Sequence, residues 1–136
     1  MRFVDTNILI YAEDVSSGEK HMRARELILD LWDKGDGVVS VQVLQEFYVN
    51  VTRKIGNPLS ARAAATIVRE YLTWQVVENT RELLVDGMAR VESAQLSFWD
   101  AMVIQAAISR GCDSLYSEDW QHGLRFGELQ IINPFV

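Results

Sequence analysis

Four acidic side chains of this sequence stand where a metal-dependent reaction on a phosphate ester would need them. Asp5 directly follows the apolar pair Phe3-Val4, and Glu46, Asp100 and Asp119 recur later beside apolar stretches. Two carboxylates about 4 Å apart repel by roughly 4 kcal/mol at an effective dielectric near 20. A fold that gathers four must protonate some of them or neutralise them with cations. Oxygen-only ligands select hard ions such as Mg²⁺ or Mn²⁺, which polarise a phosphodiester and activate water.

Asp5 and Glu46 each also have a purely structural explanation. Asp5 can cap the helix that follows it, although Thr6 and Asn7 can cap that helix equally well. A buried charge at a strand end is costly without a partner, which favours a functional role for Asp5. Glu46 is a good helix former and can simply lie on a solvated helix face, so its position alone favours neither interpretation.

The two later acids are open to the same question. Asp100 is the third residue after Ser97, where an acid can reciprocate a capping hydroxyl and is favoured by the helix dipole. The apolar neighbours of Asp100, Trp99 among them, predict that this turn packs against the core, which favours function. Asp119, or Glu118 beside it, can be a turn or N-cap residue, but Asp119 also follows a predicted strand as Asp5 does.

Hydrophobic periodicity and turn residues divide the chain into alternating strands and helices. The predicted strands cover residues 2–5, 38–41, 75–78, 114–117 and 129–132. The predicted helices cover residues 6–13, 19–34, 41–54, 60–72, 80–94 and 97–110. Strands separated by helices, often two at a time, predict an α/β fold whose parallel sheet carries helices on both faces. We expect a single domain over residues 1–136. In such sheets ligands bind at the carboxyl ends of the strands, where Asp5 is expected.

Composition limits the class of protein without deciding its function. The chain has 136 residues, a hydrophobic fraction of 49% and a net charge of −6, which argues against binding nucleic acid by broad electrostatics alone. A cluster of metal-binding acids contributes to that negative charge, and bound cations would offset it. No apolar run reaches the length of a membrane span, and no signal-peptide pattern is visible. Cys112 is the only cysteine, so an internal disulfide is impossible and a cytoplasmic location is expected.

Four ordered motifs resemble the PIN-domain family, and within it the VapC-type toxins of bacterial toxin–antitoxin pairs. The motifs are Phe3-Val4-Asp5-Thr6-Asn7-Ile8-Leu9, Ser40 through Leu44-Gln45-Glu46-Phe47, Leu96-Ser97-Phe98-Trp99-Asp100-Ala101 and Leu115-Tyr116-Ser117-Glu118-Asp119. Together they span nearly the whole chain, and the Asp-Thr-Asn start is the most specific piece.

The resemblance implies a three-layer fold with a parallel five-stranded sheet in the order 3-2-1-4-5. It implies a Mg²⁺- or Mn²⁺-dependent ribonuclease in which Asp5, Glu46, Asp100 and Asp119 form the metal centre. It also implies a homodimer whose site is blocked by a segment of a cognate antitoxin.

The resemblance gives supporting roles to Thr6, Asn7 and Ser117, which would orient carboxylates or metal-bound water through hydrogen bonds. The fourth acid departs from the family pattern, because the strand-four motif often reads Thr-x-Asp and here is Ser117-Glu118-Asp119. Asp119 matches by position, and Glu118 is the alternative.

Three other functions fit parts of the sequence. A housekeeping RNA-processing nuclease would use the same acids, and a neighbouring gene for a small basic antitoxin would distinguish the toxin from it. A phosphohydrolase with Asp5 as covalent nucleophile would want a second acid two residues later, where Asn7 stands. A non-catalytic PIN-like or Rossmann-like binding module would use the acids only as caps and surface charge. A dinucleotide role lacks its glycine-rich phosphate cradle.

Overall fold

The structure, a computed structural model, describes residues 1–136 and builds them around one six-stranded sheet. The strand order is β3-β2-β1-β4-β6-β5, and every pairing is parallel except that of β5 with β6. The strands are β1 (Arg2–Val4), β2 (Gly37–Ser40), β3 (Gln75–Val77), β4 (Ser114–Tyr116), β5 (Arg125–Phe126) and β6 (Leu129–Ile132). The predicted parallel order 3-2-1-4-5 is confirmed, with β6 in the place of the predicted fifth strand.

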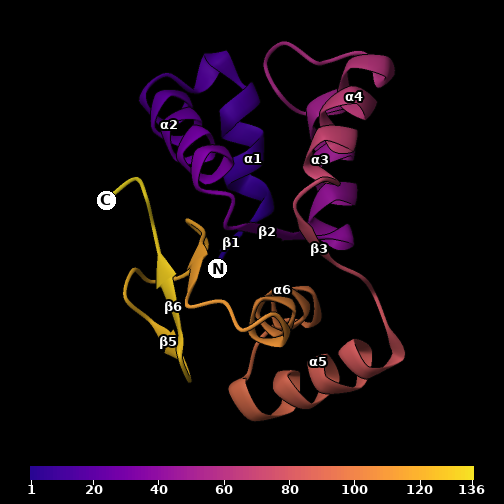
Figure 1. The fold of residues 1–136 in the computed structure, drawn as a ribbon, viewed down its shortest axis with the longest axis vertical. Helices are drawn as coiled ribbons and strands as arrows, with labels where there is room; N and C mark the ends of the chain where they lie inside the picture. The colour runs from indigo at the N-terminus through magenta and orange to yellow at the C-terminus, as the bar shows by residue number, and fades with distance from the viewer.

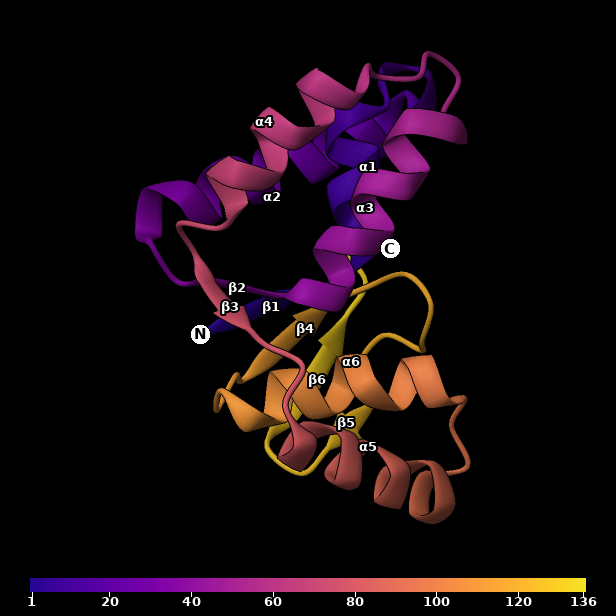
Figure 2. The same cartoon turned by 90° about the vertical axis from the view of Figure 1, so that its right-hand side faces the viewer.

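Helices cover both faces of the sheet, as predicted. Figures 1 and 2 show α1 to α4 on one side of the strands and α5 with α6 on the other. The helices are α1 (Thr6–Glu13), α2 (Glu19–Lys34), α3 (Val41–Arg53), α4 (Ala61–Tyr71), α5 (Arg81–Ala94) and α6 (Phe98–Ser109), with a short 3₁₀ helix, η1 (Val15–Ser17), between α1 and α2. None of these helices combines the length and the apolar character needed to cross a membrane.

The sixth strand was not predicted. Arg125 and Phe126 form a two-residue strand that pairs antiparallel with Gln130 and Leu129. Gly127 begins the turn between them at φ 61°, a conformation that glycine adopts without strain. Two residues are too few to show an alternating pattern, so no periodicity predicts this edge strand.

Local capping explains why most of the helices begin where they do. The hydroxyls of Ser40, Ser60, Thr80 and Ser97 each accept a hydrogen bond from the backbone three residues later, at the starts of α3, α4, α5 and α6. The sequence leaves open whether Asp5, Thr6 or Asn7 caps the helix after β1. The strand ends one residue earlier, at Val4, and the extended Asp5 is itself the N-cap of α1.

The central strand β1 fixes where the first acid lies. Phe3 and Val4 are completely buried, and Phe3 stands in register with Val38 of β2 and Leu115 of β4. The chain leaves β1 at Asp5, whose backbone N–H donates to the carbonyl of Tyr116 at 3.0 Å. Asp5 therefore lies at the carboxyl edge of the sheet, between the segments that leave β2 and β4.

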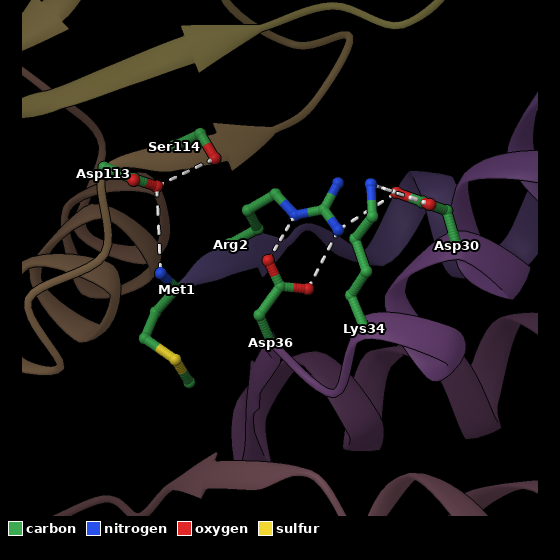
Figure 3. Close-up of polar contacts among 7 residues, drawn as sticks. All are labelled: Met1, Arg2, Asp30, Lys34, Asp36, Asp113 and Ser114. Atoms are coloured by element: carbon green, nitrogen blue, oxygen red, sulfur yellow. Dashed lines mark hydrogen bonds and ion pairs between the residues drawn. The ribbon is translucent and has the colours of Figure 1, made fainter.

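Arg2 fastens the opposite, amino-terminal end of β1. Its Nε and Nη2 donate to the two carboxylate oxygens of Asp36 at 2.7 and 2.9 Å, and Nη2 also lies 3.0 Å from Asp30 on α2 (Figure 3). The Arg2 guanidinium holds the pKa of Asp36 below its usual range. This paired geometry is more specific than a single ion pair and joins β1 to the turn before β2.

We predict that Arg2→Ala lowers the free energy of unfolding by about 2 kcal/mol, because it removes two charge-assisted hydrogen bonds of a half-buried side chain. Thermal unfolding of the variant and of wild type would measure the loss. Lys34→Ala is the control, since Lys34 is 61% exposed and pairs only with Asp30 in the same helix. Equal stability of the two variants would contradict this role for Arg2.

Candidate metal centre

Asp5 is a buried carboxylate with a hydrogen-bond donor at each oxygen. Only 5% of the residue is exposed. The backbone N–H of Thr6 donates to Oδ1 at 2.8 Å, and the Ser117 hydroxyl donates to Oδ2 at 2.7 Å. The first donor comes from the start of α1 and the second from the segment that leaves β4. The structure thus joins the two neighbouring parallel strands through this one side chain.

Burial raises the pKa of Asp5 from 3.8 to about 7. The hydrogen bonds from Ser117 and Thr6 oppose that rise, because they stabilise the charged form. The negative charges of Asp119 and Glu46 raise the pKa further, which places both of these acids in the electrostatic environment of Asp5. Near neutral pH the Asp5 carboxyl group is therefore present in both its protonated and its ionised form, and a bound cation would favour the ionised form.

Glu46 lies on α3 and is held by two donors. The Thr6 hydroxyl donates to Oε2 at 3.2 Å, and Gln42 Nε2 donates to Oε1 at 2.9 Å. Gln42 is buried and stands one helical turn before Glu46, so the pair is a helical i,i+4 contact. Gln42 is a neighbour of the site that the sequence motifs do not mark, although its spacing of four residues from Glu46 is a usable signal.

Asp100 lies in the first turn of α6. The Ser97 hydroxyl accepts a hydrogen bond from the Asp100 backbone N–H at 3.2 Å, as the capping prediction required. Gln42 Nε2 also contacts the carbonyl oxygen of Trp99 at 3.4 Å, which brings the start of α6 beside Glu46. The expectation that Trp99 packs against the core is wrong, since 62% of it is exposed. Ala101, two residues after Trp99, is completely buried instead.

Asp119 completes the set through Ser117. The fully buried Ser117 Oγ accepts hydrogen bonds from the backbone N–H of Asp119 at 3.1 Å and from Asn7 Nδ2 at 3.4 Å. Partial burial raises the pKa of Asp119, hydrogen bonds with Asp5 and Asn7 oppose the rise, and the charges of Asp100 and Glu118 add to it. Asp119 is thereby linked to both Asp5 and Asp100.

Glu118, the alternative fourth acid, is paired with residues outside the set of candidate acids. It accepts hydrogen bonds from the Tyr11 hydroxyl and from Lys20 Nζ, the latter at 2.8 Å. A salt bridge with Lys20 already neutralises its charge. Of the two adjacent acids, Asp119 is the one that shares an environment with Asp5.

The donor set suits a hard divalent cation, although the side chains are not gathered around a single point. No group of three or more His, Cys, Asp or Glu residues lies close enough together to hold one metal ion. The carboxylates of Asp5 and Glu46 instead accept hydrogen bonds from Ser117 and Gln42, and repulsion between the negative charges keeps the acids apart. Mg²⁺ commonly takes only one or two carboxylates and keeps several waters. The buried Oδ1 of Asn7 has no hydrogen-bond partner, which leaves an oxygen ready for a cation or its water.

The comparison with protein families settles the identity of the fold. The pattern of the PIN domain family matches residues 2–124. The chain belongs to the PIN domain family. A search of curated proteins found no match.

Solved structures of the same fold include several toxins. A toxin–antitoxin complex from Klebsiella pneumoniae is 17% identical with a TM-score of 0.71, and the match covers 98% of each chain. VapC20 from Mycobacterium tuberculosis, described as a sarcin-ricin loop cleaving toxin, is 24% identical with a TM-score of 0.65, over 88% of this chain and 90% of that one. VapBC2 from Rickettsia felis, bound to a promoter DNA fragment, is 15% identical with a TM-score of 0.63, over 96% of each chain. At these identities the PIN fold is what the chains share.

We predict that Asp5→Asn stabilises the metal-free PIN domain increasingly as the pH rises from 4 to 7. The folded wild type binds a proton at Asp5 up to about pH 7, whereas the unfolded chain releases it near 3.8. The wild type therefore loses stability across this interval, by up to about 4 kcal/mol, and the variant lacks this loss. Thermal unfolding in chelator at several pH values would measure the difference.

The control for this experiment is Asp33→Asn, which removes one exposed carboxylate on α2. We expect its stability to follow that of wild type at every pH. Parallel curves for wild type and Asp5→Asn would show that Asp5 is not a strained buried acid.

Proposed function

We propose that this chain is a Mg²⁺- or Mn²⁺-dependent endoribonuclease, the toxin of a toxin–antitoxin pair acting in the cytoplasm. The observation that carries the proposal is the buried carboxylate of Asp5. It lies at the carboxyl edge of the sheet and is electrostatically coupled to Glu46 and Asp119. The charges of Glu46 and Asp119 act on Asp5, and that of Asp100 acts on Asp119, which favours a bound cation. The PIN family and the toxin-like fold support the choice of reaction.

In this proposal Asp5, Glu46, Asp100 and Asp119 hold the metal, directly or through its waters. The bound ion would supply the positive charge that polarises a phosphodiester and favours an attacking hydroxide. The ring of donors around the acids fixes their directions. Ser117 orients Asp5 and the Asp119 backbone, Thr6 orients Asp5 and Glu46, and Asn7 keeps one oxygen free.

A protein partner is proposed from the exposed apolar surface. A groove of about 360 Å³ between α3 and α4 is lined almost entirely by apolar side chains. Its residues include Leu72, Val49 and Tyr48, which are 52%, 45% and 36% exposed. Contiguous apolar surface of this kind is typical of protein interfaces. We propose that this face joins two copies of the chain, and that a cognate antitoxin covers the acidic site of the dimer.

The nuclease prediction is tested by cleavage of a structured RNA pool with Mg²⁺ or Mn²⁺ and then with chelator. Intact mass analysis must first establish that no partner co-purified. We expect metal-dependent cutting by wild type and a loss of at least about 100-fold in Asp5→Asn and in Asp100→Asn, since both would lose a metal contact. Both variants should unfold as cooperatively as wild type.

Asp33→Asn serves as the matched control, because it removes the same charge from a distant exposed position. It should cut RNA at the wild-type rate. Full cleavage by both Asp5→Asn and Asp100→Asn would end the metal-site hypothesis. A wild type that binds metal but cuts none of the pool would instead indicate that its specificity excludes the RNAs in the pool.

The dimer is tested by sedimentation of the purified chain. We expect the mass of two chains for wild type and of one chain for Leu72→Asp, because a buried unpaired charge is costly at an apolar interface. Val15→Asp is the control, since Val15 is 76% exposed and lies in η1, away from the groove. A single-chain mass for wild type would contradict the proposed interface.

A further inference from the structure

A second hollow lies beside the acidic site, between the starts of α5 and α6. Its volume is about 390 Å³. The segment before α5 and its first turn contribute Asn79, Arg81 and Leu84, and α6 contributes Phe98, Trp99 and Met102. The lining of the hollow thus combines apolar, aromatic and polar side chains, which is the composition of a small-ligand site.

Trp99 is the feature of this hollow that the fold does not need. It is 62% exposed, more than any of the other three tryptophans. Its ring contacts Phe98 edge to face, with centroids 4.9 Å apart and planes at 74°. Phe98 and the buried Met102 already close the core beneath it. An indole that contributes so little to the core is available to stack on another flat group.

Arg81 is the second unexplained residue. It is the first residue of α5, where the helix dipole disfavours a cation. The six ion pairs of the chain do not include it, and it is exposed in a protein of net charge −6. Asn79, two residues earlier, presents an exposed amide at the same rim. The Arg81 cation suits a phosphate, the Asn79 amide suits the edge of a base, and the exposed Trp99 indole suits the face of a base.

One side chain connects this hollow to the candidate metal centre. Gln42 Nε2 contacts the Trp99 carbonyl at 3.4 Å and donates to Glu46 Oε1 at 2.9 Å. Asp100 directly follows Trp99 on α6. Trp99 therefore belongs both to the hollow and to the turn of α6 that carries Asp100.

We propose that the hollow binds one unpaired base of an RNA substrate. The base stacks on Trp99, Asn79 bonds to its edge, and Arg81 pairs with a neighbouring phosphate. Stacking on an aromatic side chain requires a base that is out of a helix. This inference rests on the proposed function and adds a base-binding subsite to that same site.

The test measures binding of fluorescein-labelled eight-nucleotide RNA of mixed sequence, in the Asp5→Asn background with Mg²⁺, so that the RNA stays intact. Trp99→Leu and Trp99→Phe form the matched pair, because they differ in aromaticity at similar size. We expect Trp99→Leu to weaken binding roughly 10-fold or more and Trp99→Phe to stay within about threefold. Val85→Ala, an exposed position of α5 outside the hollow, should bind like the parent.

An abasic oligoribonucleotide of the same length separates base stacking from phosphate contact. We expect Trp99→Leu and Trp99→Phe to bind it equally, and Arg81→Gln to weaken both oligonucleotides. Equal binding of the base-containing RNA by Trp99→Leu and Trp99→Phe would overturn the inference. So would absence of RNA binding with Trp99 intact, or a change of sedimenting mass in Trp99→Leu, which would assign the indole to an interface with a second copy.

Cleavage kinetics distinguish failure of this inference from failure of the proposed function. If wild type cuts RNA and Trp99→Leu has the same KM as wild type, the base subsite is contradicted and the nuclease proposal stands. If wild type cuts no RNA but binds the labelled RNA in a Trp99-dependent way, the nuclease proposal is contradicted and the base subsite stands.

Discussion

The burial of the Asp5 carboxylate is the constraint on which the rest of this site depends. A carboxylate with 5% of its residue surface exposed would be costly without compensation. The chain compensates it partly, with one hydrogen bond from the start of α1 and one from the segment after β4. Burial, with a smaller contribution from the charges of Asp119 and Glu46, still raises the pKa of Asp5 to about 7. Only a cation would relieve the remaining repulsion without protonation.

The fold produces this arrangement through the position of β1. The strand is paired on both sides, so the chain that leaves it enters a space already flanked by the ends of β2 and β4. Ser117 then serves three groups at once, as donor to Asp5 and as acceptor for Asp119 and Asn7. Asp5, Glu46 and Asp119 are therefore each positioned by a neighbour that another of these three acids also uses. This sharing is why we expect the acids to act as a unit.

Much of the fold was predictable from the sequence, because its signals are local. Apolar periodicity places the helices and parallel strands, and hydroxyl residues such as Ser40 and Ser97 mark helix starts by satisfying backbone N–H groups. The two-residue β5 has no period to detect. The N-cap role of Asp5 depends on β1 ending at Val4, and the extent of a strand depends on its partners.

The candidate site was predictable in its acids and less so in their surroundings. The acids stand out because charged residues beside apolar runs are unusual. The partners of Glu118, which are Tyr11 and Lys20, come from 107 and 98 residues away in the chain, and no local pattern joins them. The exposure of Trp99 likewise depends on how α6 meets α3 through Gln42, which is a tertiary contact. The pairing of side chains across the edge of the sheet could not be predicted from the sequence.

The most direct test of this account is Mn²⁺ binding, measured by titration calorimetry on wild type and on single variants of the four acids. We predict that wild type binds Mn²⁺ and that the affinity for Mn²⁺ is lower in each of four variants, Asp5→Asn, Glu46→Gln, Asp100→Asn and Asp119→Asn. Glu118→Gln should leave it unchanged, because Glu118 is already paired with Lys20. Mn²⁺ affinity that is unaltered in Asp5→Asn and Asp119→Asn would contradict the claim that these carboxylates form one metal centre.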